Sequence, residues 1–249
     1  MKLLAFDTST DTLSIAVQHG DRVLEHSGPG AAQASASLIG ALGVLLDQAG
    51  LTLDALDALV VGRGPGSFTG VRTACSVAQG LAFGARGGQG LPVLGVDTLL
   101  AVAEQARLQQ GCTQVLATLD ARMDQVYWAA CRWQDAADGG YWQTGQTGQT
   151  EADIGLCAPQ DLRLPAACTT AVTTTDWVVA GNAQAAYGQR LLPQARHVPA
   201  LPTAAALLRL APALLARGLA APAQALLPRY VRDKVAQTTA EREAAKRTV

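Results

Sequence analysis

The chain opens with apolar segments that predict an antiparallel sheet. Lys2–Phe6 is almost wholly apolar, Leu13–Val17 alternates, and Arg22–His26 follows after a short polar break. Short alternating runs bounded by turn residues are typical of strands. His19–Gly20–Asp21 between the second and third segments has the composition of a hairpin turn. We therefore expect three antiparallel strands at the start of the chain.

Helical periodicity then replaces the alternation. Over Ala31–Ala49 the residues Leu38, Leu42 and Leu45 recur at the spacing that places them on one face of a helix. Strands and helices are expected to alternate after it, with strands at Ala58–Val61 and Pro92–Val96 and helices at Thr69–Gly84 and Thr98–Gln109.

A similar order of elements begins again near Gln114. The expected elements are strands at Gln114–Leu119, Gln125–Arg132 and Asp176–Ala180, a loose hairpin at Gly139–Thr150, and helices at Ala183–Leu192 and Pro202–Arg217, the last interrupted near Pro212. This duplication predicts two α/β lobes, residues 1–110 and 111–231. The helix at 202–217 could pack back on the first lobe, and residues 232–249 form a charged tail.

Composition limits the classes of function. The chain has 249 residues, of which 49% are hydrophobic and 16% charged, with a net charge of −1. No basic stripe suggests a surface that grips nucleic acid. The five cysteines are scattered without C-x-x-C spacing, which favours reduced thiols in a cytoplasm. No apolar run resembles a membrane span or a signal peptide, so we expect no membrane partner.

The most distinctive motif is a glycine-rich loop, G-R-G-P-G-S-F-T-G-V-R at Gly62–Arg72, between a strand and a helix. Glycine has no side chain, so another segment can approach the backbone of this loop closely. Either Ser67 or Thr69 can cap the following helix. The structural residues expected here are Gly62, Gly64, Pro65, Gly66, Ser67 and Gly70. A tight strand-to-helix connection without further function is the alternative.

Two polar turns suggest phosphate loops. Asp7-Thr8-Ser9 directly follows the first strand, and Asp120 follows the first strand of the second lobe. Both positions resemble the phosphate loops of the actin, Hsp70 and sugar-kinase superfamily, in which amides and hydroxyls meet phosphate. The motif lacks a lysine of the P-loop kind, and the alternative is that both aspartates cap turns. A nucleotide-binding ATPase or kinase therefore stays open as a second function.

Metal and nucleophilic chemistry have little support. None of the three histidines has a partner three or four residues away, so we expect no metal site. Ser67 lies in G-S-F-T-G, which is one residue short of the G-x-S-x-G nucleophile motif. We expect no catalytic residue in this chain, and a peptidase is the least favoured alternative.

The first two helices are nearly uncharged on every side, which leaves two interpretations. Either the lobe buries both faces of each helix, or the helices pair with equivalent helices of another chain. For the second interpretation the expected interface residues are Ser37, Ala41, Thr73, Ser76, Val77 and Gly80.

Four segments together resemble the TsaB (YeaZ) family. They are L-A-F-D-T-S-T from Leu4, the loop at Gly62–Arg72, L-D-A-R-M from Leu119 with Val126-Tyr127, and P-R-Y-V-R at Pro228–Arg232. The resemblance implies a two-lobe actin-like ATPase fold, of the ASKHA and ribonuclease H-like type. It also implies a role in threonylcarbamoylation of the adenosine beside the anticodon of tRNAs that read codons beginning with A.

The same resemblance implies a division of labour. TsaD carries a histidine pair that holds the metal and catalyses the transfer, while TsaB is a non-catalytic subunit that pairs with TsaD through its first two helices. The ATPase TsaE joins the pair, tRNA is reached through the complex, and TsaB alone forms homodimers. We expect no cofactor held tightly by this chain, and binding of ATP or ADP at the boundary between subunits stays open. Older usage files the family with glycoprotein endopeptidases.

Two segments depart from the family pattern. Gln33–Ser37 replaces a stretch that often carries a histidine, and Gln125 stands where an acidic residue is usual. Both departures weaken any catalytic role for this chain. The sequence therefore predicts a scaffold subunit whose glycine loop positions the second helix.

Overall fold

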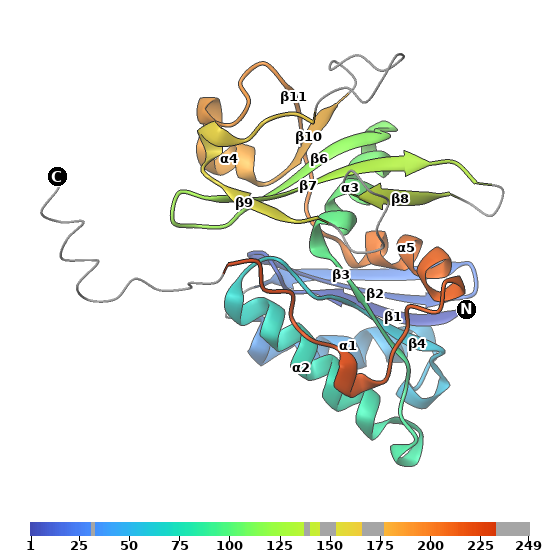
Figure 1. Ribbon diagram of the computed structural model, residues 1–249. Helices are drawn as coiled ribbons and strands as arrows, with labels where there is room; N and C mark the ends of the chain where they lie inside the picture. The colour runs from blue at the N-terminus through green and yellow to red at the C-terminus, as the bar shows by residue number, and fades with distance from the viewer. Residues whose placement is uncertain (31–32, 137–139, 145–152, 166–176, 233–249) are drawn as a thin grey trace, which may run out of the picture.

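Two mixed β-sheets, with helices between and outside them, make up the fold (Figure 1). The computed structural model describes residues 1–30, 33–136, 140–144, 153–165 and 177–232. Residues 233–249 of the expected tail at 232–249, residues 139 and 145–150 of the expected hairpin at 139–150, and Asp176 lie outside the described residues.

The first sheet has the strand order β3-β2-β1-β4-β5. Its strands are β1 (Lys2–Asp7), β2 (Thr12–His19), β3 (Arg22–Pro29), β4 (Ala58–Gly62) and β5 (Val93–Val96). The first three strands are antiparallel, whereas β4 runs parallel to β1 and β5 runs parallel to β4. Helices α1 (Ala34–Ala49) and α2 (Phe68–Gly84) cover one face of this sheet (Figure 1).

The second sheet has the order β11-β10-β6-β7-β8, with β9 also paired to β7. Its strands are β6 (Gln114–Asp120), β7 (Val126–Gln134), β8 (Tyr141–Thr144), β9 (Gly155–Cys157), β10 (Val178–Gly181) and β11 (Arg196–Pro199). The remaining helices are α3 (Thr98–Gln110), α4 (Ala183–Tyr187) and α5 (Ala204–Ala216), with short 3₁₀ turns at Leu53–Ala55, Ala85–Gly88, Pro159–Asp161, Gly188–Arg190 and Ala223–Ala225.

Helices α3 and α5 lie between the sheets and join them through one hydrophobic core. This core combines Leu3 and Val60 of the first sheet with Leu99 of α3, Val115 of the second sheet and Leu207 of α5. The amide of Ala204, at the start of α5, donates a hydrogen bond of 2.9 Å to Ser14 Oγ in β2. Although α5 follows the second sheet in sequence, it therefore packs on the first.

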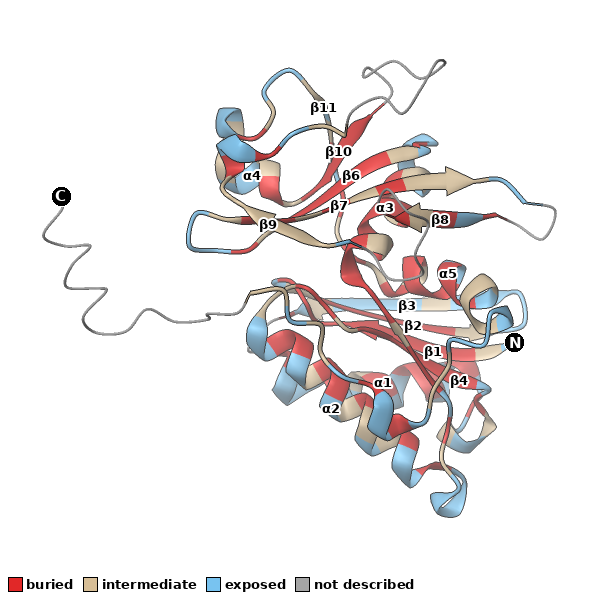
Figure 2. Ribbon diagram, in the orientation of Figure 1, coloured by how far each residue is buried: buried red, intermediate tan, exposed pale blue. Residues whose placement is uncertain are grey.

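A second core lies between the first sheet and helices α1 and α2. It contains the leucines that the sequence places on one face of α1, together with Phe6 and Ala78. Figure 2 shows both helices with a buried side toward the sheet and an exposed side away from it. The first interpretation, in which the lobe itself buries every face of α2, is therefore wrong.

The helix boundaries in the second lobe differ from the prediction. Helix α4 ends at Tyr187 and not at Leu192, because Gly188 adopts a φ of 53° that breaks the helical path. Helix α5 continues through Pro212 without the expected interruption. A proline inside a helix costs about 3 kcal/mol, and here the buried neighbours Leu208 and Ala211 hold the helix in place.

The short strands β9 and β11 are absent from the prediction. Part of the expected loose hairpin is β8, which pairs with β7 from Cys131 opposite Thr144 to Gln134 opposite Tyr141. In the described part of the chain, no helix is both long and apolar enough to cross a membrane.

Candidate functional site

The glycine loop packs directly on the turn that follows β1. The amide of Ser67 donates a hydrogen bond of 2.7 Å to the carbonyl of Ser9, and Thr8 Oγ1 donates one of 2.6 Å to the carbonyl of Gly70. A Cβ atom at Gly66 would lie 2.4 Å from the Ser9 carbonyl oxygen, and one at Gly70 would lie 1.8 Å from that of Thr8. Glycine at both positions allows two backbones to touch.

Asp7 is sealed beneath this contact. Its Oδ1 accepts hydrogen bonds from the amide and hydroxyl of Ser9, at 2.8 and 2.6 Å. Its Oδ2 has no hydrogen-bond partner among the described residues, and a Cβ at Gly62 would lie 1.8 Å from it. Burial outweighs the hydrogen bonds from Ser9 and raises the pKa of Asp7 to about 6.

The expected first phosphate loop is therefore occupied by the chain itself. Asp7 and Thr8 are completely buried and Ser9 is 2% exposed. The amide and hydroxyl of Ser9 donate to Asp7 Oδ1, and the hydroxyl of Thr8 donates to the carbonyl of Gly70, so these groups already have partners within the chain. Ser67 also caps α2, because its hydroxyl accepts a hydrogen bond of 3.4 Å from the amide of Gly70.

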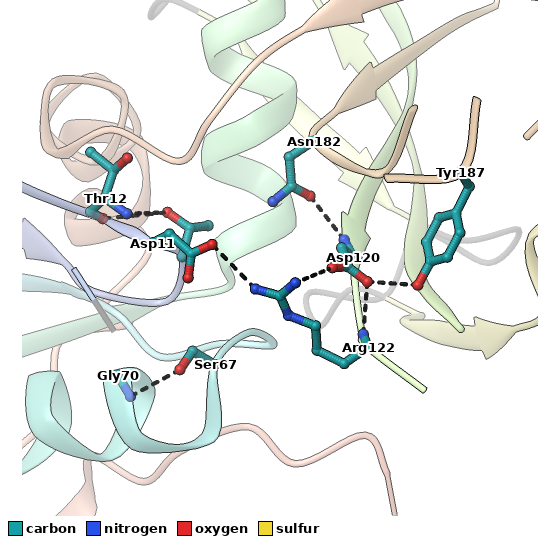
Figure 3. A network of polar contacts seen from close by, with 9 residues as sticks. Asp11, Thr12, Ser67, Gly70, Asp120, Arg122, Asn182 and Tyr187 are labelled. Carbon is teal, nitrogen blue, oxygen red and sulfur yellow. Dashed lines mark hydrogen bonds and ion pairs between the residues drawn. The ribbon is translucent and has the colours of Figure 1, made fainter. Parts of the chain in front are cut away.

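A cavity of about 860 Å³ lies between the two lobes. Its polar lining includes Ser9, Thr10, Asp11, Ser67, Asp120, Arg122, Asn182, Arg229 and Arg232. Arg122 spans the cavity, since its guanidinium is 3.2 Å from Asp11 in the first lobe and 3.2 Å from Asp120 in the second (Figure 3).

At the second expected phosphate loop, Asp120 likewise forms hydrogen bonds with other residues of the chain. Asp120 accepts hydrogen bonds from the amide of Arg122 at 2.8 Å and from the hydroxyl of Tyr187 at 2.6 Å. The Asp120 amide donates to Asn182 Oδ1 at 2.8 Å (Figure 3). Partial burial and the bond to Asp120 raise the pKa of Tyr187 to about 12, so the phenol remains a hydrogen-bond donor at neutral pH.

Residues 226–232, which we call the C-terminal strap, connect the two lobes. Arg229 forms an ion pair of 3.1 Å with Asp97, which also pairs with Arg63 of the glycine loop at 2.8 Å. Arg232 donates to the carbonyl of Ala121 at 3.1 Å and to Gln125 Oε1 at 2.6 Å, both in the turn between β6 and β7. The strap therefore links the glycine loop to the second sheet.

The outer side of α1 and α2, which we call the α1–α2 face, is exposed and largely apolar. Ile39 is 61% exposed, Val44 58% and Phe83 73%. Of the residues expected at a partner interface, Ser37, Ser76 and Gly80 are exposed, while Ala41, Thr73 and Val77 are half-buried. Ala41 and Val77 also pack against the lobe's own core. Thr73, Ser76 and Val77 line a groove on this face together with Ser35, Phe68, Thr69 and Arg72.

No other reactive group stands out in the described residues. There, no group of three or more His, Cys, Asp or Glu side chains is placed to hold a metal ion. Burial raises the pKa of Cys75 to about 12, so this thiol stays protonated and acts as a small core residue.

Comparison with known proteins identifies the family. The family model described as TsaD, tRNA N6-adenosine threonylcarbamoyltransferase, matches residues 29–240. The structure of YeaZ from Pseudomonas aeruginosa is 36% identical with a TM-score of 0.77, and the match covers 92% of this chain and 99% of that one. The chain belongs to the TsaB (YeaZ) family.

Two curated relatives agree with this assignment. The tRNA threonylcarbamoyladenosine biosynthesis protein TsaB of Escherichia coli (strain K12) is 42% identical over 129 residues, which are 52% of this chain and 54% of that protein. Its counterpart from Haemophilus influenzae is 39% identical over 129 residues, 52% and 53% of the two chains. The chain thus spans about half the length of the curated relatives it matches. The two-lobe architecture expected for a TsaB-family chain is confirmed.

Sequence reasoning on this TsaB-family chain missed the role of P-R-Y-V-R at Pro228–Arg232. Tyr230 accepts a hydrogen bond of 2.6 Å from Arg72, a residue 158 positions earlier in the chain. A signal was present, because two arginines flank an aromatic residue in an otherwise apolar segment. Their partners could not be identified without the fold.

The backbone contact predicts a sharp difference between two glycines of α2. Gly70→Ala forces a Cβ against the Thr8 carbonyl oxygen, whereas Gly80 has no atom within 4 Å of its Cβ position. We expect Gly70→Ala to lower the free energy of unfolding by more than about 2 kcal/mol. Gly80→Ala should change it by less than about 1 kcal/mol, in the stabilising direction. Urea unfolding of both variants measures the difference, and equal stabilities would contradict the contact.

The buried carboxyl predicts a pH effect. Its folded pKa of about 6 exceeds the ordinary 3.8, so the folded state binds the proton more tightly. Stability contributed by protonated Asp7 is then lost as pH rises through about 6. Asp7→Asn should raise the free energy of unfolding by about 2–3 kcal/mol at pH 7.5 and match the wild type near pH 4. Urea titrations across this range test it, and a difference that does not depend on pH would contradict it.

Proposed function

We propose that this chain is a non-catalytic subunit of the machinery that makes threonylcarbamoyladenosine in tRNA. The modified residue is the adenosine beside the anticodon in tRNAs that read codons beginning with A. The names of the Escherichia coli and Haemophilus influenzae relatives support the pathway. The match to the TsaD family model supports a place beside an enzyme of similar fold.

The α1–α2 face is the observation that carries this proposal. Exposed apolar patches on proteins commonly mark protein–protein contacts. Ile39, Val44 and Phe83 stand out from a lobe whose other large apolar residues are mostly buried. TsaD docks on this face and carries out the transfer, and TsaE joins the pair as its ATPase. Without TsaD, two copies of the chain pair through a related surface.

A nucleotide-binding ATPase is the second candidate, and the interlobe cavity is the observation in its favour. Its volume and its lining of hydroxyls and arginines suit a polar ligand. Against it, the carboxylate of Asp7 is sealed under Gly62, out of reach of a metal–phosphate complex. We therefore propose that ATP or ADP binds at the boundary with TsaD. We also propose that the chain meets tRNA only through the complex and that it works in the cytoplasm. A peptidase has no supporting observation among the described residues.

Blocking the α1–α2 face should abolish the complex. Gly80→Arg places a long cation on the exposed side of α2, where space is open. Burying an unpaired charge in an apolar interface costs several kcal/mol. We expect Gly80→Arg to lose co-purification with TsaD while it remains at least as resistant to urea as the wild type.

Leu108→Arg on α3 is the matched control, because Leu108 is 54% exposed and lies away from this face. It should bind TsaD as the wild type does. Retention of TsaD by Gly80→Arg, or its loss from Leu108→Arg, would move the interface elsewhere.

Reconstitution tests the function itself. Purified TsaD, TsaE and the enzyme that makes the threonylcarbamoyl adenylate should modify tRNA only when this chain is added, and the chain alone should not turn over ATP. The readout is the modified nucleoside by mass spectrometry. ATP hydrolysis by the isolated chain that is lost in Asp7→Ala would support the ATPase instead.

A further inference from the structure

Among the described residues, Arg72 is the only charged one that lines the groove on the α1–α2 face. The other lining residues are Ser35, Phe68, Thr69, Thr73, Ser76 and Val77. Arg72 is exposed, and no carboxylate in the described part of the chain pairs with it. A guanidinium at the edge of such a groove is a strong, directional donor and can bind an acceptor on another molecule.

Two aromatic rings hold the Arg72 side chain. Its Cζ lies 3.7 Å from the centroid of the Phe68 ring and 5.4 Å from that of Tyr230. Its Nε donates a hydrogen bond of 2.6 Å to the hydroxyl of Tyr230. Since Nε is used within the chain, the terminal nitrogens are left for an outside acceptor. Stacking also removes side-chain freedom that binding would otherwise have to remove.

The C-terminal strap fixes the ring that orients Arg72. Tyr230 lies between Arg229, which pairs with Asp97, and Arg232, which bonds to the turn between β6 and β7. Gln79 of α2 also donates to the carbonyl of Leu226 in the strap, at 2.8 Å. The far end of the chain therefore completes a surface built on α2.

We propose that Arg72 is the charged anchor of this groove and that it binds a carboxylate, an Asp or Glu side chain, on the docking surface of the TsaD partner. Tyr230 is the residue that positions it. This inference rests on the proposed function and adds the recognition chemistry to it. A protein carboxylate suits the site better than a nucleic-acid phosphate, because the rest of the groove is uncharged and the whole chain carries a net charge of −1.

A second copy of the chain is the competing occupant. Asp47 is the one acidic residue in the sequences of α1 and α2, so a homodimer that satisfied Arg72 from these helices would have to use it. Self-association of Arg72→Gln and Asp47→Asn variants, measured by sedimentation, separates the two cases.

The test measures the dissociation constant for purified TsaD of the same organism by calorimetry. Arg72→Gln should weaken binding at least tenfold, within the range for buried anchor residues. Arg72→Lys should recover only part of this, since an ammonium cannot copy the bidentate pairing. Tyr230→Phe, which keeps the ring and removes the hydroxyl, should weaken binding several-fold. Arg22→Gln on the exposed strand β3 changes the net charge equally and should leave the affinity within twofold.

Exchanging the two charges between the chain and TsaD tests whether Arg72 pairs with a carboxylate of TsaD. Arg72→Glu should abolish binding, and one Asp→Arg or Glu→Arg change on the docking surface of TsaD should restore it. If the wild type itself fails to bind TsaD, the proposed function fails. If the wild type binds and Arg72→Gln binds equally well, this inference is overturned and the proposed function stands. A loss of self-association in both Arg72→Gln and Asp47→Asn, with TsaD binding intact, assigns the groove to a second copy and also overturns it.

Discussion

The contact between two backbones, the glycine loop and the turn after β1, determines much of what this molecule can do. Because Gly66 and Gly70 carry no Cβ, α2 begins directly over Thr8 and Ser9. That placement has two consequences at once. It seals Asp7 away from solvent, and it sets the small buried residues of α2, among them Ala74 and Ala78, against the first sheet, so that the opposite side of the helix faces outward. One steric constraint thus closes a potential phosphate site and presents the α1–α2 face.

The lobes are held together in two different ways. Between the sheets, α3 and α5 share a continuous apolar core with both of them, which is favourable in proportion to the area removed from water. At the edge of the cavity, Arg122, Arg229 and Arg232 reach carboxylates or carbonyl groups across it or along the strap. The pair between Arg122 and Asp11 is exposed on both sides, and such pairs contribute little to stability. Their role is to orient the strap, and with it the aromatic ring that stacks on Arg72.

Sequence reasoning succeeded where the signal was local. The β1–β3 meander, the leucine face of α1, the cap at Ser67 and the strand–loop–helix around the glycines all follow from spacing within a few residues. It failed where tertiary packing decides. Pro212 remains helical because its neighbours are buried, and β9 and β11 are too short to show an alternation. The Asp7–Thr8–Ser9 turn carries the pattern of a phosphate loop, yet only the fold brings Gly62 and Gly70 on top of it.

The arrangement of the polar groups fits the binding role proposed for this chain. A catalytic site holds polar groups in readiness for a ligand, often with strongly perturbed pKa values in an open cleft. Here the most perturbed carboxyl, Asp7, lies in no cleft, and Asp120 already accepts hydrogen bonds from Tyr187 and Arg122. The described chain also presents an exposed helical face on which the guanidinium of Arg72, held by Phe68 and Tyr230, makes no ion pair. Such a surface gains free energy by covering itself with a complementary protein, and the lone cation restricts which protein can do so.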